Sequence, residues 1–185
     1  IVTWATYIIA YGVRSTSSPL AIANGIVLSL CTLFSVFYYI FKDKKRINND
    51  KKVRRIRKSE LVFLFLIIFV SVFLMFYTFY IIGDVIHVGF TVFSDFSPHL
   101  SMIRSFSKSN NFPTQYTFFT GQDIRYHFMF MFLVGNLEYL GLRLDFAFNI
   151  PSVMGLVTTY LLLYVLAVKI TGKKEVGFLA GLFFT

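Results

Sequence analysis

Residues 61–82 read LVFLFLIIFVSVFLMFYTFYII, an uncharged run of aliphatic and aromatic side chains. A second uncharged run, PLAIANGIVLSLCTLFSVFYYIF, occupies residues 19–41. An α-helix needs about 20 apolar residues to cross about 30 Å of hydrocarbon, and both runs reach that length. They predict two membrane-spanning helices and an all-α, polytopic membrane protein.

The segment between these runs is strongly basic. Residues 42–58 read KDKKRINNDKKVRRIRK and carry eight of the nine units of net positive charge in the 185-residue chain. A basic loop between two spans is typical of the cytoplasmic side, so we expect 42–58 to be cytoplasmic and to contact anionic membrane lipid. No aromatic residues interleave with the charges, so we expect no nucleic-acid partner.

The composition of the whole chain supports the membrane interpretation. Hydrophobic residues make up 56% of the chain and charged residues only 15%, against about 25% in soluble globular domains. This excludes a soluble enzyme and a disordered tail, and the single cysteine, Cys31, excludes a disulfide scaffold. We therefore expect an integral protein of the plasma membrane.

The topology of the second half depends on one short segment. Residues 126–141 have too few uncharged positions before Glu138 to span a bilayer, whereas 146–168 are uncharged throughout. Lysines follow that run, and the positive-inside rule places them in the cytoplasm only if 126–141 does not cross. We expect 126–141 to be a juxtamembrane helix at the outer interface and 84–125 to be an extracytoplasmic loop with short juxtamembrane helices.

The chain also has apolar ends. Residues 1–12 are typical of the end of an earlier span, and 176–185 begin a further one. We expect a fragment of a longer polytopic protein, with an N-terminal membrane region over 1–58 and a second membrane region over 59–185.

Ionisable side chains gather in the predicted outer loop and at its edge, and membrane proteins rarely place so many near the interface without a use. They are Asp84, His87, Asp95, His99, Arg104, Asp123, Arg125 and His127. Because charged groups are otherwise concentrated in the basic segment, this loop is the predicted site of any chemistry.

Asp95 is the strongest candidate for a catalytic residue among these side chains. Ser94 can cap a short helix that runs from Asp95 to about Lys108, in which Asp95 and His99 share a face. The Asp95 carboxylate could accept a proton from a hydroxyl group, or it could serve only as a helix cap. Another face of this helix could rest on the bilayer. It comprises Phe96, Leu100, Ile103 and Ser107.

The remaining charged residues suggest ligands. Asp95 and His99 together could bind a divalent metal, although no third ligand lies at a sequence spacing typical of a metal site. The planar guanidinium groups of Arg104 and Arg125 could form paired hydrogen bonds with phosphate, or they could only contact lipid headgroups. Glu138 and Asp145 flank Arg143, and simple pairing accounts for them.

The order of these features resembles the GT-C superfamily of membrane glycosyltransferases, and it looks most like the protein O-mannosyltransferase and aminoarabinose transferase type. The resemblance covers about residues 60–185. It runs from the Ser94-Asp95-Phe96 motif through Tyr126-His127 to the Asn149-Ile150-Pro151-Ser152 start of the next span and the basic turn after it. Phe96 stands where the family often has a second acidic residue, and no proline follows His127.

The resemblance implies a sugar donor linked to polyprenyl phosphate and transfer on the extracytoplasmic face. It places Asp95 at the catalytic acidic position. The substrate-binding residues would be His99, Arg104, Asp123, Arg125, Tyr126 and His127. The Asp-Phe-Ser-Pro-His run at 95–99 is also faintly similar to oligosaccharyltransferase catalytic subunits, which implies a metal-dependent variant through Asp95 and His99.

Two other function classes remain open. A transporter or channel would place charges within its spans, and the long runs here carry none. A non-catalytic membrane assembly subunit would tolerate replacement of Asp95, His99 and Arg104.

Overall fold

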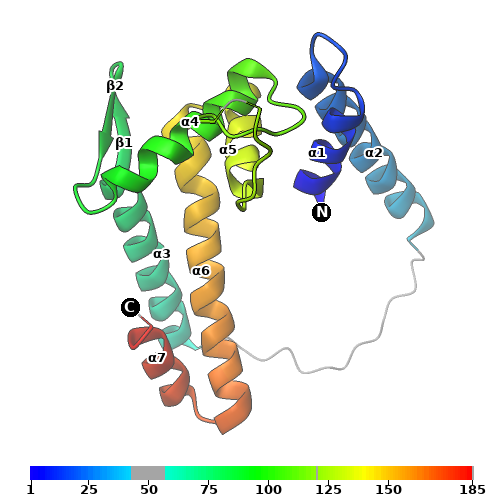
Figure 1. The fold of residues 1–185 in the computed structure, drawn as a ribbon. Coiled ribbons are helices and arrows are strands. Elements are labelled where there is room, and N and C mark those ends of the chain that lie inside the picture. Colours follow the sequence, from blue (N-terminus) through cyan, green and yellow to red (C-terminus); the bar gives the residue numbers. More distant parts are fainter. Residues whose placement is uncertain (43–56, 120, 185) are drawn as a thin grey trace. The chain divides into compact units, whose positions relative to one another are not determined.

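The computed structural model describes residues 1–42, 57–119 and 121–184. Within these ranges the chain is mostly helical, with seven helices and one two-stranded antiparallel sheet (Figure 1). The order is α1 (Val2–Gly12), α2 (Pro19–Phe41), α3 (Lys58–Thr78), β1 (Phe79–Ile82), β2 (Val85–Val88), α4 (Phe93–Ser109), α5 (Met129–Tyr139), α6 (Leu144–Thr171) and α7 (Lys174–Leu182). The predicted cytoplasmic loop lies, apart from its ends, outside the described residues.

Three of the described helices are long and apolar enough to cross a membrane, namely α2, α3 and α6. This finding supports an integral membrane protein. Helix α2 coincides with the apolar run at 19–41, and α6 contains the whole run at 146–168. Helix α5 lies inside the predicted juxtamembrane segment 126–141, and its 11 residues rise only about 16 Å.

The prediction that 61–82 is helical throughout is wrong at its end. Helix α3 stops at Thr78, and the next four residues form β1, which pairs with β2 in a register that sets Phe79 opposite Val88 and Ile82 opposite Val85. Gly83 and Asp84 make the two-residue turn, in which Gly83 has a φ of 58°. The hairpin forms because a Gly-Asp pair between two runs of β-branched and aromatic residues favours a tight turn over a helix.

The described chain divides into two compact units. The α1/α2 unit covers Ile1–Lys51 and Ser94–Leu144, and the α3/α6 unit covers Lys52–Phe93 and Asp145–Thr185. Each unit joins two separate stretches of sequence.

In the α3/α6 unit the two long helices are antiparallel (Figure 1). Near the start of α6, the Asn149 Nδ2 donates to the carbonyl oxygen of Phe79 at 2.7 Å, just past the end of α3. Near the other end, the Tyr164 hydroxyl donates to Glu60 Oε1 at 3.0 Å, in the first turn of α3. If both helices cross a bilayer, antiparallel packing requires an even number of crossings between them, which supports the prediction that 126–141 does not cross.

In the α1/α2 unit, α5 packs among the other helices through aromatic and amide side chains. The ring of Tyr7 on α1 lies 5.2 Å from the rings of both Phe128 and Phe132, measured between centroids. Asn24 of α2 and Asn136 of α5 exchange amide hydrogen bonds of 2.7 and 3.0 Å in a buried setting. Amide pairs of this kind hold helices together where water is excluded.

The face of α4 that was predicted to rest on the bilayer is covered by other parts of the protein. Phe96, Ile103 and Ser107 are buried inside the protein, so the prediction that this face rests on the bilayer is wrong. The reason is Gly135 of α5: a Cβ built there would lie 2.6 Å from the carbonyl oxygen of Ile103. The missing side chain lets the backbones of α4 and α5 approach closely and cover that face.

Candidate functional site

Helix α4 and the loop that follows it line a pocket of about 400 Å³ in the α1/α2 unit. Its wall combines one carboxylate, one imidazole, two phenols and a hydroxyl with apolar side chains. The lining residues are Asp95, Pro98, His99, Met102, Tyr116, Thr117, Phe118, Ile124, Tyr126 and Met131. A partly apolar hollow with a few convergent polar groups is the usual form of a small-molecule site.

Helix α4 supplies one side of this pocket. Asp95, His99 and Met102 follow a helical spacing of four and three residues, so they project along the same face. The prediction that Asp95 and His99 share a face is therefore confirmed. The helix begins two residues earlier than expected, at Phe93, and Asp95 lies in its first turn.

The loop after α4 is folded back onto the helix by one side chain, Asn111. Asn110 ends the helix in the left-handed region at a φ of 50°, a position that asparagine tolerates. Asn111 Nδ2 then donates to Ser105 Oγ at 3.0 Å and to the Gln115 carbonyl at 2.9 Å, and its Oδ1 accepts from Gln115 N at 2.9 Å. These bonds fix the start of the loop and direct the residues after it toward the pocket.

The sequence pattern did not predict the loop residues that this reversal of the chain brings to the pocket. Tyr116, Thr117 and Phe118 line the pocket, and the Thr117 hydroxyl lies 2.7 Å from the hydroxyl of Ser101 on α4. The turn-forming Asn110-Asn111 pair marks where the chain reverses. It does not show which of the following residues return to the helix.

Tyr126 closes the pocket from the far end of the loop. Its ring stacks near the imidazole of His99, with centroids 6.2 Å apart and planes inclined by 23°. Three of the predicted site residues, Asp95, His99 and Tyr126, therefore line one pocket although 31 positions separate the first and last.

The other predicted residues of this loop lie around the pocket rather than in its wall. Arg125 is exposed between two lining residues, Ile124 and Tyr126. His127 packs against the ring of Tyr126 at a centroid distance of 3.8 Å. Asp123 is exposed, and its backbone forms an isolated β-bridge with Gln115.

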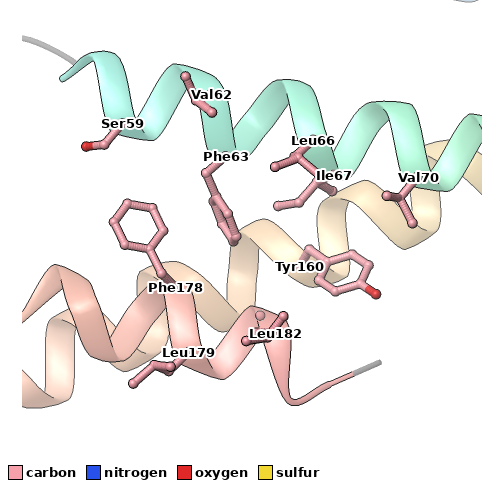
Figure 2. A pocket seen from close by; sticks show the side chains of 11 residues that line it. Ser59, Val62, Phe63, Leu66, Ile67, Val70, Tyr160, Phe178, Leu179 and Leu182 are labelled. Carbon is pink, nitrogen blue, oxygen red and sulfur yellow. The ribbon is translucent and has the colours of Figure 1, made fainter.

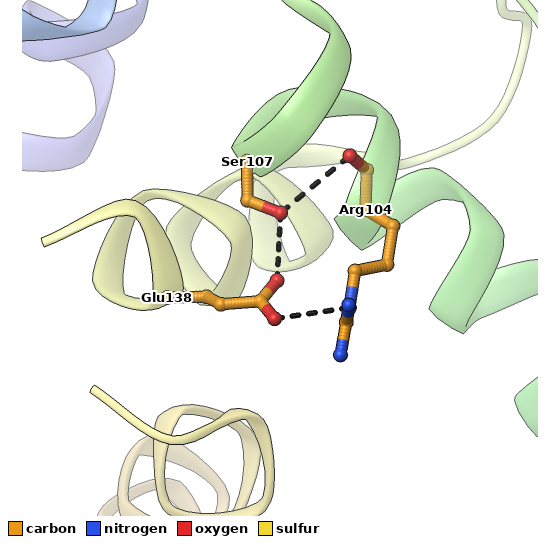
Figure 3. Close-up of polar contacts among 3 residues, drawn as sticks. All are labelled: Arg104, Ser107 and Glu138. Atoms are coloured by element: carbon orange, nitrogen blue, oxygen red, sulfur yellow. Dashed lines mark hydrogen bonds and ion pairs between the residues drawn. The ribbon is translucent and has the colours of Figure 1, made fainter. Parts of the chain in front are cut away.

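Arg104 has a partner that the sequence did not indicate (Figure 3). Its Nε lies 2.9 Å from Glu138 Oε1, and Ser107 Oγ donates to Glu138 Oε2 at 2.6 Å. The Glu138 side chain is only 9% exposed, whereas that of Arg104 is 47% exposed. Glu138 thus reaches across to α4, a contact that pairing with its neighbour Arg143 did not anticipate.

Asp145 and the hairpin residues belong to the α3/α6 unit. Asp145 is buried, and its Oδ2 accepts from the backbone N–H of Ile81 at 3.1 Å. His87 stacks on Tyr80 within the hairpin, with centroids 4.8 Å apart and planes inclined by 7°. Asp84 lies in the hairpin turn, so neither Asp84 nor His87 lines the pocket of Asp95.

The donor set near Asp95 does not suit a metal held by protein alone. Over residues 1–42, 57–119 and 121–184, no three His, Cys, Asp or Glu side chains gather closely enough to hold an ion. Asp95 and His99 offer two ligands, whereas protein metal sites generally use three or more.

Comparison of this chain with protein-family models, with curated proteins and with solved structures gives no match.

Proposed function

We propose that the protein is a membrane glycosyltransferase. It moves a sugar from a polyprenyl-phosphate-linked donor to an acceptor hydroxyl on the extracytoplasmic face. The supporting observation is the pocket itself, in which an exposed carboxylate, Asp95, lies within one hollow with His99 and Tyr126. The resemblance in feature order to GT-C enzymes suggests the donor class.

In the proposed reaction Asp95 is the general base. Its carboxylate takes the proton of the acceptor hydroxyl as that oxygen attacks the anomeric carbon of the sugar. The bond between the anomeric carbon and the phosphate oxygen breaks, and the lipid phosphate leaves with the electron pair. Attack opposite the leaving group inverts the anomeric configuration.

The leaving phosphate needs a positive partner. Arg125 is the better of the two arginine candidates because it is exposed at the rim, beside Ile124 and Tyr126. Arg104 already pairs with Glu138 through its Nε. Tyr126 and His99 would hold the sugar between their rings and the opposite wall. Asp95 and His99 are the two candidate metal ligands in the pocket wall, and the proposed reaction assigns no step to a metal ion.

The decisive variant is Asp95→Asn in the full-length protein. It keeps the side-chain shape and removes the base, so we expect the transfer rate to fall by about 10²–10⁴-fold with little change in folding. The assay is in vitro transfer of radiolabelled sugar from a lipid-linked donor to an acceptor.

The matched control is Asp84→Asn, which changes a carboxylate in the hairpin turn and should leave the rate unchanged. Undiminished transfer by Asp95→Asn would refute the general-base role. A protein without transfer activity in any lipid-linked donor assay, but with full function after replacement of Asp95, His99 and Arg125, would instead be an assembly subunit.

A further inference from the structure

A second, larger hollow lies in the α3/α6 unit, with a volume of about 640 Å³ (Figure 2). It is a groove between α3 and α7, with Tyr160 of α6 at its base. The rings of Phe63 on α3 and Phe178 on α7 are in edge-to-face contact in its wall, with a centroid distance of 5.0 Å. Apart from Ser59 at one end and the Tyr160 hydroxyl, its lining is hydrocarbon.

The groove walls are exposed although they are apolar. Val62, Leu66 and Leu182 expose 60%, 54% and 66% of their surface. Exposed apolar side chains on a helix long enough to cross a membrane are expected to contact lipid. Gly181 lets α7 pack closely on the ring of Phe63, since a Cβ there would lie 2.8 Å from that ring.

The length of the groove restricts its occupant. From Ser59 to Val70 along α3 the helix rises about 16 Å, which is roughly half of the 30 Å hydrocarbon core. That depth corresponds to one leaflet. A single acyl chain of one leaflet has a matching length.

The polar end of the groove is basic. Arg57 and Lys58 precede Ser59 and are exposed, and Lys173 is exposed at the start of α7. Two acidic residues lie at this end. Glu60 is paired with Lys174, whose Nζ lies 2.6 Å from Glu60 Oε1, and Glu175 is exposed in the first turn of α7. The three exposed basic side chains still outnumber the one exposed carboxylate, so this end has a net positive charge that attracts an anion, in line with the net charge of +8 that the sequence carries over 42–58.

We propose that this groove binds one acyl chain of an anionic phospholipid, with the lipid phosphate at the end formed by Lys58, Ser59 and Lys173. The site lies at the start of α3, and the lipid comes from the leaflet that faces the basic segment. It does not depend on the proposed transfer reaction, because its residues do not overlap with those of the Asp95 pocket.

The test is native mass spectrometry of the full-length protein in detergent. The protein is titrated with dioleoyl phosphatidylglycerol and, separately, with dioleoyl phosphatidylcholine, which has the same chains and no net charge. We expect tighter binding of phosphatidylglycerol. Lys58→Gln and Lys173→Gln should each weaken it by about fivefold. They should weaken phosphatidylcholine less, because its choline cation offsets the charge of its phosphate. Lys108→Gln on α4 is the charge control and should have no effect.

The groove itself is tested by Leu66→Trp, which fills it, against Leu74→Trp, which places the same side chain on α3 outside it. Leu66→Trp should lower the affinity for both lipids, and Leu74→Trp should not. Equal wild-type affinity for the two lipids, equal effects of Lys58→Gln and Lys108→Gln, or equal effects of the two tryptophan variants would overturn the proposal. A mass corresponding to a dimer that Leu66→Trp dissociates would assign the groove to a second copy of the chain instead. The lysine variants alter exposed side chains, so they decide the question even if a tryptophan variant fails to fold.

Discussion

The two compact units use polar side chains in different places. In the α1/α2 unit, polar contacts lie within the helix packing, as in the Asn24–Asn136 pair and the Arg104–Glu138 ion pair. In the α3/α6 unit, the polar contacts described above lie at the two ends of the long helices, where Asn149 bonds Phe79 and Glu60 bonds Tyr164 and Lys174. Between those ends, Ser71 of α3 is buried with no hydrogen-bond partner for its hydroxyl among the described residues.

This difference matches what each unit has to do. Two helices in hydrocarbon gain no hydrophobic driving force from packing against each other, so polar contacts near the membrane surfaces can set their register. A unit that holds a pocket with polar walls needs its polar groups fixed from several elements at once. The comparison predicts that disturbing the two units has separable effects.

The largest effect on folding is expected from Gly135→Ala. The added Cβ would lie 2.6 Å from the backbone oxygen of Ile103, and backbone cannot move away as a flexible side chain can. We expect a loss at the upper end of the about 1–3 kcal/mol typical of overpacking, measured by unfolding of the full-length protein in mixed micelles. Gly155→Ala on α6 meets nothing within 4 Å and is the matched control. Hydrogen exchange should rise in α4 and α5 and stay unchanged in α6; a uniform rise would contradict the separation of the units.

A smaller effect is expected from Asn149→Ala in the α3/α6 unit. The change leaves the Phe79 carbonyl without its Asn149 donor, but it also removes the buried Asn149 Oδ1, which has no partner within the described residues. The two terms oppose each other, so we expect a loss of about 1 kcal/mol, with increased hydrogen exchange in the hairpin. Thr159→Ala, which removes only a bond to the carbonyl of Gly155 in the same helix, should cost less. An equal cost for both would show that the contact does not hold the hairpin.

The smallest effect is expected for the coupling of Arg104 and Glu138. The Arg104 side chain is 47% exposed, so solvent screens the pair, and a double-mutant cycle with alanine at both positions should give about 0.5–1 kcal/mol. Salt should reduce this coupling further. A coupling several times larger would mean that the pair is shielded from water, for example by lipid, and would sharpen the contrast between the two units.

The sequence predicted the long helices well because their signal is local. The α2 boundaries agree with the uncharged run to the residue, and α6 exceeds its run by only a few positions at each end. The hairpin was missed because its residues are as apolar as the helix before it, although Gly83-Asp84 carried the turn signal. For 1–12 and 176–185, the proposal that they belong to further spans stays a prediction.

The candidate site was predicted only in part. That Asp95 and His99 share one face of α4 follows from helical spacing, which the sequence displays directly. Tyr116, Thr117 and Phe118 reach the pocket wall because the hydrogen bonds of Asn111 fold the loop back onto α4. Arg104 forms an ion pair with Glu138 because α4 and α5 approach closely at Gly135. Such contacts between distant positions leave no periodic pattern to read.

The antiparallel course of α3 and α6 also bears on how the protein is made. If both helices cross the bilayer, everything from Phe79 to Arg143 must be delivered to the same side as one polypeptide before α6 can insert. That translocated stretch contains few basic residues, namely Arg104, Lys108, Arg125 and Arg143. Clusters of lysine and arginine close to a membrane span tend to stay in the cytoplasm during insertion. The scarcity of these residues between α3 and α6 therefore favours export of this stretch during synthesis.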